Sequence, residues 1–210
     1  MTTLTKAGVA VVGVGTLGGG AILANNLLNK SEDIPKTITI ETNLKSFEKE
    51  LGESVLKLVG NDNQKEWGER AKELATSTSQ LDASLNKQTV KTWEQLRDWC
   101  NGSRNDTFDK DSVKYKNFEE FCTWKVGDKL TGHIPKETVE SDGKWRTAHA
   151  ALKGKNNLPQ SLKDIVSTAE ANDADKKAMR KWCTDSYKEN WVGSKDTKVA
   201  LVKEHCKLNG

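Results

Sequence analysis

The sequence predicts a mainly α-helical chain, with an N-terminal transmembrane helix followed by two tandem, duplicated helical modules. Three observations predict this fold class. Residues 7–28 are apolar or uncharged throughout. In most of the remaining chain, apolar residues recur at spacings of three and four, which is typical of amphipathic helices. Finally, a Trp-Cys step occurs twice, and each copy is followed by a second Cys at nearly the same distance along the chain.

Residues 1–30 are predicted to be a transmembrane signal anchor. As a helix, residues 7–28 would rise about 33 Å, enough to cross a hydrocarbon core of about 30 Å. A cleaved signal peptide is the alternative, although no clean small-x-small site follows the apolar core. Residues 31–42 are polar and contain a Pro, which suits a juxtamembrane linker. The expected partner of residues 7–28 is a lipid bilayer, in a single-pass protein of the cell membrane.

The same apolar segment also matches a dinucleotide-binding fingerprint, with Gly13, Gly15 and Gly18 in the required places. A dinucleotide-binding enzyme is therefore the alternative function. Such a fold needs further βαβ units, and no run rich in β-branched residues follows residue 43. We expect a protein that is not an enzyme and uses no cofactor, and the sequence identifies no small-molecule substrate.

Two helical repeats are predicted, at 43–124 and 128–208. A Trp-x6-Leu phrase occurs in both, and the Trp-Cys step recurs at a slightly larger offset than that phrase, so repeat 2 carries extra residues within 163–178. Internal similarity of this kind indicates one supersecondary unit used twice. The tryptophans predicted to form the repeat scaffold are Trp67, Trp99, Trp145 and Trp182.

Helical spacing places the cysteines of both repeats on buried stripes. A first helix is predicted from its N-cap at Thr42 to Gly60, with apolar positions from Leu44 to Leu58. In each repeat the Trp-Cys step and the second Cys end similar apolar patterns, so both cysteines should face the core from neighbouring helices. The Asn101-Gly102 step could end the first of these helices early in repeat 1.

Cysteine pairing within each repeat is the favoured interpretation. A disulfide needs Cα atoms within about 7 Å, which neighbouring antiparallel helices can provide, and closing a loop of this length stabilises by roughly 3 kcal/mol. Buried free thiols are the alternative. Paired cysteines fit an oxidising exterior, so the bulk of the chain is expected to be extracellular. The candidate disulfides are Cys100–Cys122 and Cys183–Cys206.

Charge and histidine placement argue against several classes of function. Basic and acidic residues are interleaved at a net charge of +3, so no nucleic-acid partner is expected. There is no Cys-x2-Cys pair, and His133, His149 and His205 do not recur between the repeats. A metal site and a His-activated Cys nucleophile are therefore both disfavoured. Trp124 has no match in repeat 2, which makes it the best candidate for a role specific to one copy.

Several features together resemble a known group of proteins. They are the short N-terminus MTTLTKAG, the Gly/Ala-rich apolar segment, the Trp-Cys steps and the Trp…Leu…Leu-x2-Ser-Leu phrases. The chain resembles the paralogous families of uncharacterised short membrane-anchored proteins of haemotropic mycoplasmas. The likeness covers nearly the whole chain but includes no catalytic motif. It implies a surface-exposed protein whose variation changes the antigens presented to a host immune system, with a host protein as its expected partner.

Overall fold

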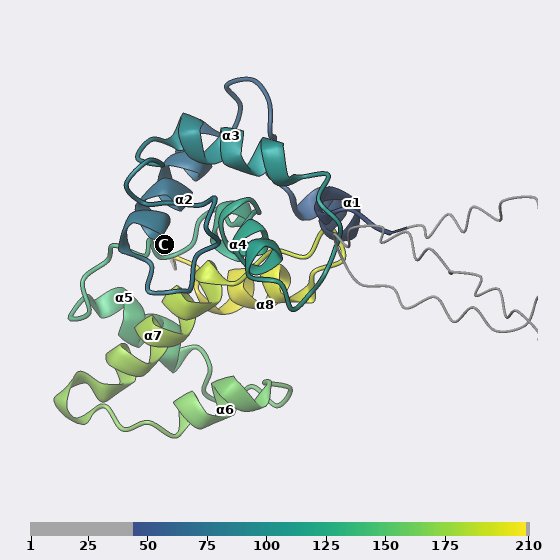
Figure 1. The fold of residues 1–210 in the computed structure, drawn as a ribbon. Coiled ribbons are helices and arrows are strands. Elements are labelled where there is room, and N and C mark those ends of the chain that lie inside the picture. The colour runs from purple at the N-terminus through teal and green to yellow at the C-terminus, as the bar shows by residue number, and fades with distance from the viewer. Residues whose placement is uncertain (1–43, 209–210) are drawn as a thin grey trace, which may run out of the picture. The chain divides into compact units, whose positions relative to one another are not determined.

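The computed structural model describes residues 44–208, which are mainly helical (Figure 1). The described residues form eight α-helices, three 3-10 turns and isolated β-bridges, without a β-strand. The predicted anchor, the linker and the three glycines of the dinucleotide fingerprint lie outside them. Within the described residues no helix is long and apolar enough to cross a membrane.

The first half of this region, residues 44–124, contains four α-helices. They are α1 (Phe47–Leu51), α2 (Gln64–Thr76), α3 (Trp93–Ser103) and α4 (Val113–Phe121), with the 3-10 turn η1 (Gly52–Ser54) after α1. Side-chain oxygens of Ser46, Thr92 and Ser112 cap α1, α3 and α4. Each accepts a bond from a first-turn N–H group that has no helical partner. The Asn101-Gly102 step does not end α3 early, because the helix continues to Ser103.

The predicted helix from Thr42 to Gly60 is wrong in its length. Within the described part of that range, α1 ends at Leu51 because Gly52 adopts a φ of 54°, a conformation that glycine tolerates best. After η1 the chain is extended, and Leu56 and Leu58 both point into the core. Leu56 and Leu58 thus follow the two-residue alternation of an extended segment, although the spacing of the apolar residues in this range also fits a helix.

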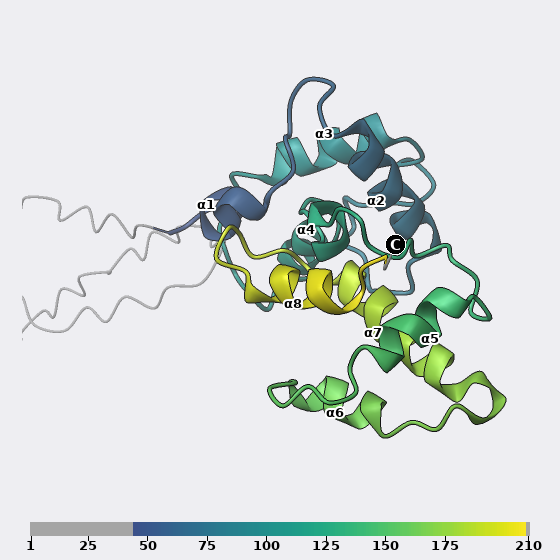
Figure 2. The same cartoon turned by 180° about the vertical axis from the view of Figure 1, so that it is seen from behind.

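The second half, residues 125–208, also contains four α-helices. They are α5 (Gly143–Ala150), α6 (Gln160–Val166), α7 (Ala174–Lys188) and α8 (Thr197–His205), with the 3-10 turns η2 (Val126–Lys129) and η3 (Ala171–Asp173). Helices α5, α6 and α7 pack on one another (Figure 2). The extra residues expected within 163–178 form the end of α6, η3 and the start of α7.

Each half has its own hydrophobic core around a fully buried tryptophan. Trp67 and Trp145 are both 0% exposed, and each lies in a separate cluster of buried apolar residues. The indole N–H of Trp67 donates to Lys57 O at 3.2 Å, and that of Trp145 donates to Val139 O at 3.0 Å. A buried indole N–H needs such a partner, because leaving it unpaired is costly.

Short extended segments pair in the same pattern in both halves. Four backbone hydrogen bonds of the first half have counterparts in the second, all with N···O distances of 2.7–3.1 Å. The matched donor and acceptor pairs are Phe47 N–Asp106 O with Val126 N–Glu189 O, Phe108 N–Lys45 O with Trp191 N–Trp124 O, Leu56 N–Cys122 O with Ile134 N–Cys206 O, and Trp124 N–Ser54 O with Leu208 N–Gly132 O.

Trp124 takes part in both series of bonds. Its N–H donates to Ser54 O in the first half, and its carbonyl accepts from Trp191 N in the second. Val126 N already donates to Glu189 O. Residues 125–127, which lie between the two predicted repeats, thus belong to the second half's pairing, and no linker separates the halves.

Candidate functional site

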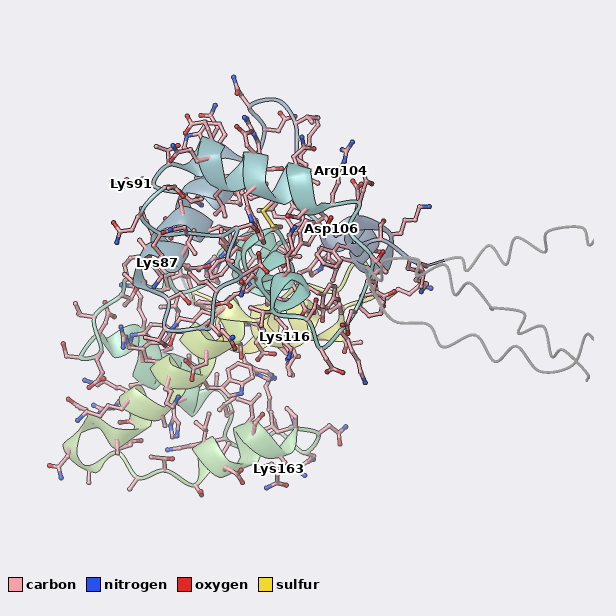
Figure 3. The ribbon with its side chains drawn as sticks, in the orientation of Figure 1. Lys87, Lys91, Arg104, Asp106, Lys116 and Lys163 are labelled. Carbon is pink, nitrogen blue, oxygen red and sulfur yellow. A yellow bond between two sulfur atoms is a disulfide. The ribbon has the colours of Figure 1, made fainter. Side chains whose placement is uncertain are left out.

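Both halves contain a buried disulfide. The Cα atoms of Cys100 and Cys122 are 5.8 Å apart, and those of Cys183 and Cys206 are 5.9 Å apart. All four residues are 0% exposed, and no free cysteine occurs in the part of the chain that the structure describes. One disulfide is visible as a yellow bond beneath α3 in Figure 3. The pairing fits the expectation from the sequence. Cys100 of α3 and Cys183 of α7 each bond to the cysteine at the C-cap of another helix of the same half, α4 or α8.

The tryptophans of the two Trp-Cys steps lie at the edges of the cores. Trp99 and Trp182 are half-buried, unlike Trp67. The indole N–H of Trp99 donates to Ser84 Oγ at 3.0 Å, and that of Trp182 donates to Ser161 Oγ at 3.3 Å. The four predicted scaffold tryptophans therefore divide into two central residues and two residues at the surface.

A groove of about 480 Å³ lies beside Trp182, between α6, α7 and α8. Its apolar lining comes from Ile165, Ala178, Trp182 and Leu201, and Ser161 and Ser186 add hydroxyl groups. We call it the Trp182 groove. The groove is concave, with an apolar floor and hydroxyl and charged groups around it, and a concave site with a mainly apolar surface is typical of small-molecule binding.

The charged residues around the Trp182 groove pair with one another. Lys181 Nζ lies 2.5 Å from Asp185 Oδ2, and Lys198 forms an ion pair with Glu189. All four side chains remain substantially exposed. The formal charges of the rim therefore cancel, and no lysine there is left without an acidic partner.

Two apolar residues of the groove, on α7 and α8, correspond to amide residues in the first half. Leu201 and Asn117 each lie five residues before the second cysteine of their half. Asn117 Nδ2 donates to Gln80 O at 2.9 Å, and its Oδ1 accepts from Asp82 N at 2.7 Å, so this amide ties a loop to α4. Leucine cannot make either bond, so nothing equivalent ties a loop to α8 at Leu201.

The second position is occupied by Gln95 in the first half and Ala178 in the second, each five residues before the first cysteine. The Gln95 side chain accepts from Lys91 N at 2.8 Å and closes the capping box of α3 with Thr92. Ala178 instead lines the groove on α7. At both positions the first half has an amide side chain that makes local hydrogen bonds, and the second half has an apolar side chain.

Helix α6 is held in place by a histidine that the first half lacks. His149 is 1% exposed, and its Nε2 lies 2.9 Å from Ile165 O, near the end of α6. The corresponding residue, four positions after the central tryptophan, is Ala71 in the first half. The failure of His149 to recur therefore reflects a structural role in positioning α6, which forms one wall of the groove.

A second cleft, of about 340 Å³, lies where the two halves meet and is lined mainly by charged residues. Arg70 of α2 is 2% exposed; its guanidinium donates to Glu73 Oε2 and Asp128 Oδ2, each at 2.5 Å. Lys125 is also buried, and its ammonium group donates to Asn190 Oδ1. Burial, followed by the charge of Arg70, lowers the pKa of Lys125 to about 8.

Further contacts at this junction hold the halves together. Lys136 Nζ lies 2.5 Å from Glu69 Oε2, and hydrogen bonds from Lys136 and then Lys72 lower the pKa of Glu69 to about 2. Glu53 Oε1 accepts from Ser194 N at 2.6 Å and from Ser194 Oγ at 2.9 Å. These bonds join side chains of the first half to the second.

Trp124, which the sequence singled out as specific to one copy, also lies at this junction. Lys129 Nζ lies 3.2 Å from the Trp124 ring centroid and 4.3 Å from that of Trp191. A cation between two indole faces is attracted by both ring quadrupoles. The structure thus gives Trp124 a role in joining the halves.

Residues 44–208 contain no group of three or more His, Cys, Asp or Glu side chains arranged to hold a metal ion. The three histidines have separate neighbours: His133 packs against Tyr187, His149 against α6, and His205 against Trp182. Burial lowers the pKa of both His133 and His205. Comparisons with protein-family models, curated proteins and solved structures find no match to this chain.

Proposed function

We propose that this chain is a membrane-anchored protein exposed at the cell surface, which acts by recognition and not as an enzyme. The observation that carries the proposal is the presence of two buried disulfides, one in each half. Structural disulfides persist in oxidising compartments and are rare in the cytosol. They support an extracellular position for residues 44–208, with residues 7–28 as the anchor in a lipid bilayer.

The scaffold of this protein is a duplicated helical unit. Supporting this are the matched backbone bonds, the two central tryptophans, the Trp-Ser hydrogen bonds and the equivalent disulfides. The predicted repeats at 43–124 and 128–208 then share Trp124 and its neighbours as a common boundary. Each unit of roughly 80 residues is near the size at which a small core gains from a covalent constraint.

Recognition would depend on the residues that differ between the two units. The shared residues are mostly buried, while differences such as Leu201 and Asn117 lie around the half-buried tryptophans. A duplicated core that tolerates a varied surface suits a protein whose exposed face changes between paralogues. The resemblance to the haemotropic mycoplasma families supports a host protein as the partner.

Protease shaving of intact cells tests this proposal. Cells that express the full chain are treated with protease, and the released peptides are reduced and identified by mass spectrometry; a lysed sample serves as the control. We expect peptides from residues 44–208 from intact cells, and retention of residues 7–28 in the membrane pellet. Release of these peptides only after lysis would contradict the extracellular position.

A further inference from the structure

We propose that the Trp182 groove binds a small, uncharged, mainly apolar molecule. This inference goes beyond the proposed function, because it concerns a small ligand in place of a protein partner and does not depend on which side of a membrane the groove faces. It rests on the size of the groove, the pairing of its charges and its contrast with the first half.

The size of the groove fits a small molecule. Its volume of about 480 Å³ lies within the range of roughly 300–1,000 Å³ that is usual for small-molecule sites. Ten residues line it, whereas a stable protein interface uses about 20–30 residues on each side. The groove alone is therefore too small for a stable protein partner, but large enough for a molecule with one or two rings.

The charges of the rim favour an uncharged ligand. Lys181 is paired with Asp185, and Lys198 with Glu189. A carboxylate or ammonium group on the ligand would meet no unpaired counter-ion, and it would lose hydration when it entered the apolar floor. An uncharged ring or alkyl group would instead gain from burial against Ile165 and Leu201.

The contrast with the first half shows which residues create the apolar floor. Around the same Trp-Ser hydrogen bond, the first half has Asn117 and Gln95, whose amides are engaged in local bonds. The second half has Leu201 and Ala178, and α6 forms an additional wall. The indole of Trp182 supplies an aromatic face on which a ring can stack.

Photolabelling of the full chain tests the proposal. The probe is 3-phenyl-3-(trifluoromethyl)diazirine, which is uncharged and apolar, and labelled peptides are mapped by mass spectrometry. We expect saturable labelling of the peptides that contain Ile165, Trp182 and Leu201. Labelling of residues 7–28 is expected to rise without saturation and serves as an internal reference in every sample.

A double variant and a matched control locate the site. Ala178→Gln with Leu201→Asn installs the residues of the first half and should reduce groove labelling at least tenfold. Ala200→Asn adds the same amide at an exposed neighbouring position of α8 that does not line the groove, and should leave labelling unchanged. Disulfide mapping and circular dichroism check that each variant folds. Undiminished labelling in the folded double variant would overturn the proposal.

A competition experiment on the unaltered chain tests the ligand class without any substitution. Excess indole, which is uncharged, should suppress groove labelling at least tenfold, while excess benzoate should suppress it less than twofold. Non-saturable groove labelling, or equal suppression by benzoate, would overturn the assignment of an uncharged apolar ligand.

Discussion

The two halves of the described region share the plan of their cores and differ in what packs over the second tryptophan of each. Each buries one tryptophan completely and closes one disulfide, and each places a second tryptophan at the edge of its core. Over that edge, Asn117 ties down a loop in the first half, whereas α6 and Leu201 border a groove in the second. The same tryptophan and disulfide frame is thus compatible with two different surroundings of the second tryptophan.

The junction between the halves differs in kind from either core. The cores are apolar, whereas the junction contains two buried cations. Arg70 is paired with two carboxylates, while no carboxylate of the described residues lies within 4 Å of the Lys125 ammonium group. Buried charge contributes less stability than apolar packing does, because desolvation offsets the electrostatic attraction. The two buried cations should therefore respond differently to removal: loss of Arg70 leaves two carboxylates unpaired, whereas loss of Lys125 removes a buried charge that has no carboxylate partner.

The central tryptophans should show the largest effects. Trp67→Ala and Trp145→Ala are each expected to lower the free energy of unfolding by about 4 kcal/mol, because each removes a fully buried indole and leaves a cavity. Urea denaturation followed by circular dichroism measures both. Similar losses would support equivalent cores; a loss below about 1 kcal/mol in one variant alone, far less than a buried aromatic side chain usually contributes, would break the equivalence.

The disulfides should show the next largest effects. Removing either bond, as Cys100→Ser with Cys122→Ser or as Cys183→Ser with Cys206→Ser, is expected to cost about 3 kcal/mol. The two costs should agree, because the paired cysteines are 22 and 23 residues apart. Denaturation of both double variants under non-reducing conditions provides the comparison. Costs that differ by more than about 2 kcal/mol, which is most of the effect expected from one bond, would show that the two frames are not equivalent.

Arg70→Ala tests the junction and is expected to cost about 2 kcal/mol. The substitution leaves Asp128 and Glu73 without their buried partner. A fully buried pair would lose about 3–5 kcal/mol, but both carboxylates keep some contact with water, which reduces the penalty. The corresponding residue in the second half is Ala148, which cannot form this ion pair. The loss of stability in Arg70→Ala should therefore report on the junction and not on the frame that the two halves share. A loss under about 0.5 kcal/mol, as for an ordinary surface substitution, would mean that this ion pair does not hold the halves together.

Lys125→Met is expected to raise the free energy of unfolding at pH 7 by about 1 kcal/mol, because it removes a buried charge. The pKa of Lys125 is about 8 in the folded protein and about 10.5 when unfolded, so the unfolded chain binds more protons between these values. The stability of the unaltered protein should therefore rise as pH increases from 8 to 10.5. The difference in unfolding free energy between Lys125→Met and the unaltered protein should therefore shrink as pH rises from 8 to 10.5.

Denaturation curves at pH 7, 9 and 10.5 measure this effect, with Lys188→Met as the control. Lys188 lines the same cleft but is exposed, so its substitution should change stability by less than about 0.5 kcal/mol. If Lys125→Met destabilises the protein at pH 7, the ammonium group contributes through its bond to Asn190 more than its burial costs.

The sequence predicted the helical fold class and the cysteine pairing because both depend on local spacing. The second cysteine and its preceding aromatic or aliphatic residues fall at helical intervals, which placed Cys122 and Cys206 on buried faces. The first helix was predicted too long because Leu58 fits two periodicities at once: the helical spacing from Leu51 and Val55, and the alternation with Leu56. Only the positive φ at Gly52, which a single sequence does not reveal, decides between them.

The groove and the charged junction could not be predicted from spacing. Both are assembled from side chains that are distant in sequence, as in the contact between Arg70 and Asp128. A weak signal was present for the groove, since Leu201 replaces Asn117 at a fixed distance before the cysteine. No local pattern indicated that His149 would hold α6 or that Lys125 would be buried.

Disulfide mapping of the unreduced full chain tests the equivalence of the halves most directly. Free thiols are blocked, the chain is digested without reduction, and linked peptides are identified by mass spectrometry. We expect two linkages and no others, Cys100 with Cys122 and Cys183 with Cys206. A linkage between Cys122 and Cys183, or recovery of all four cysteines as blocked thiols, would contradict a scaffold of two units that are each closed by their own disulfide.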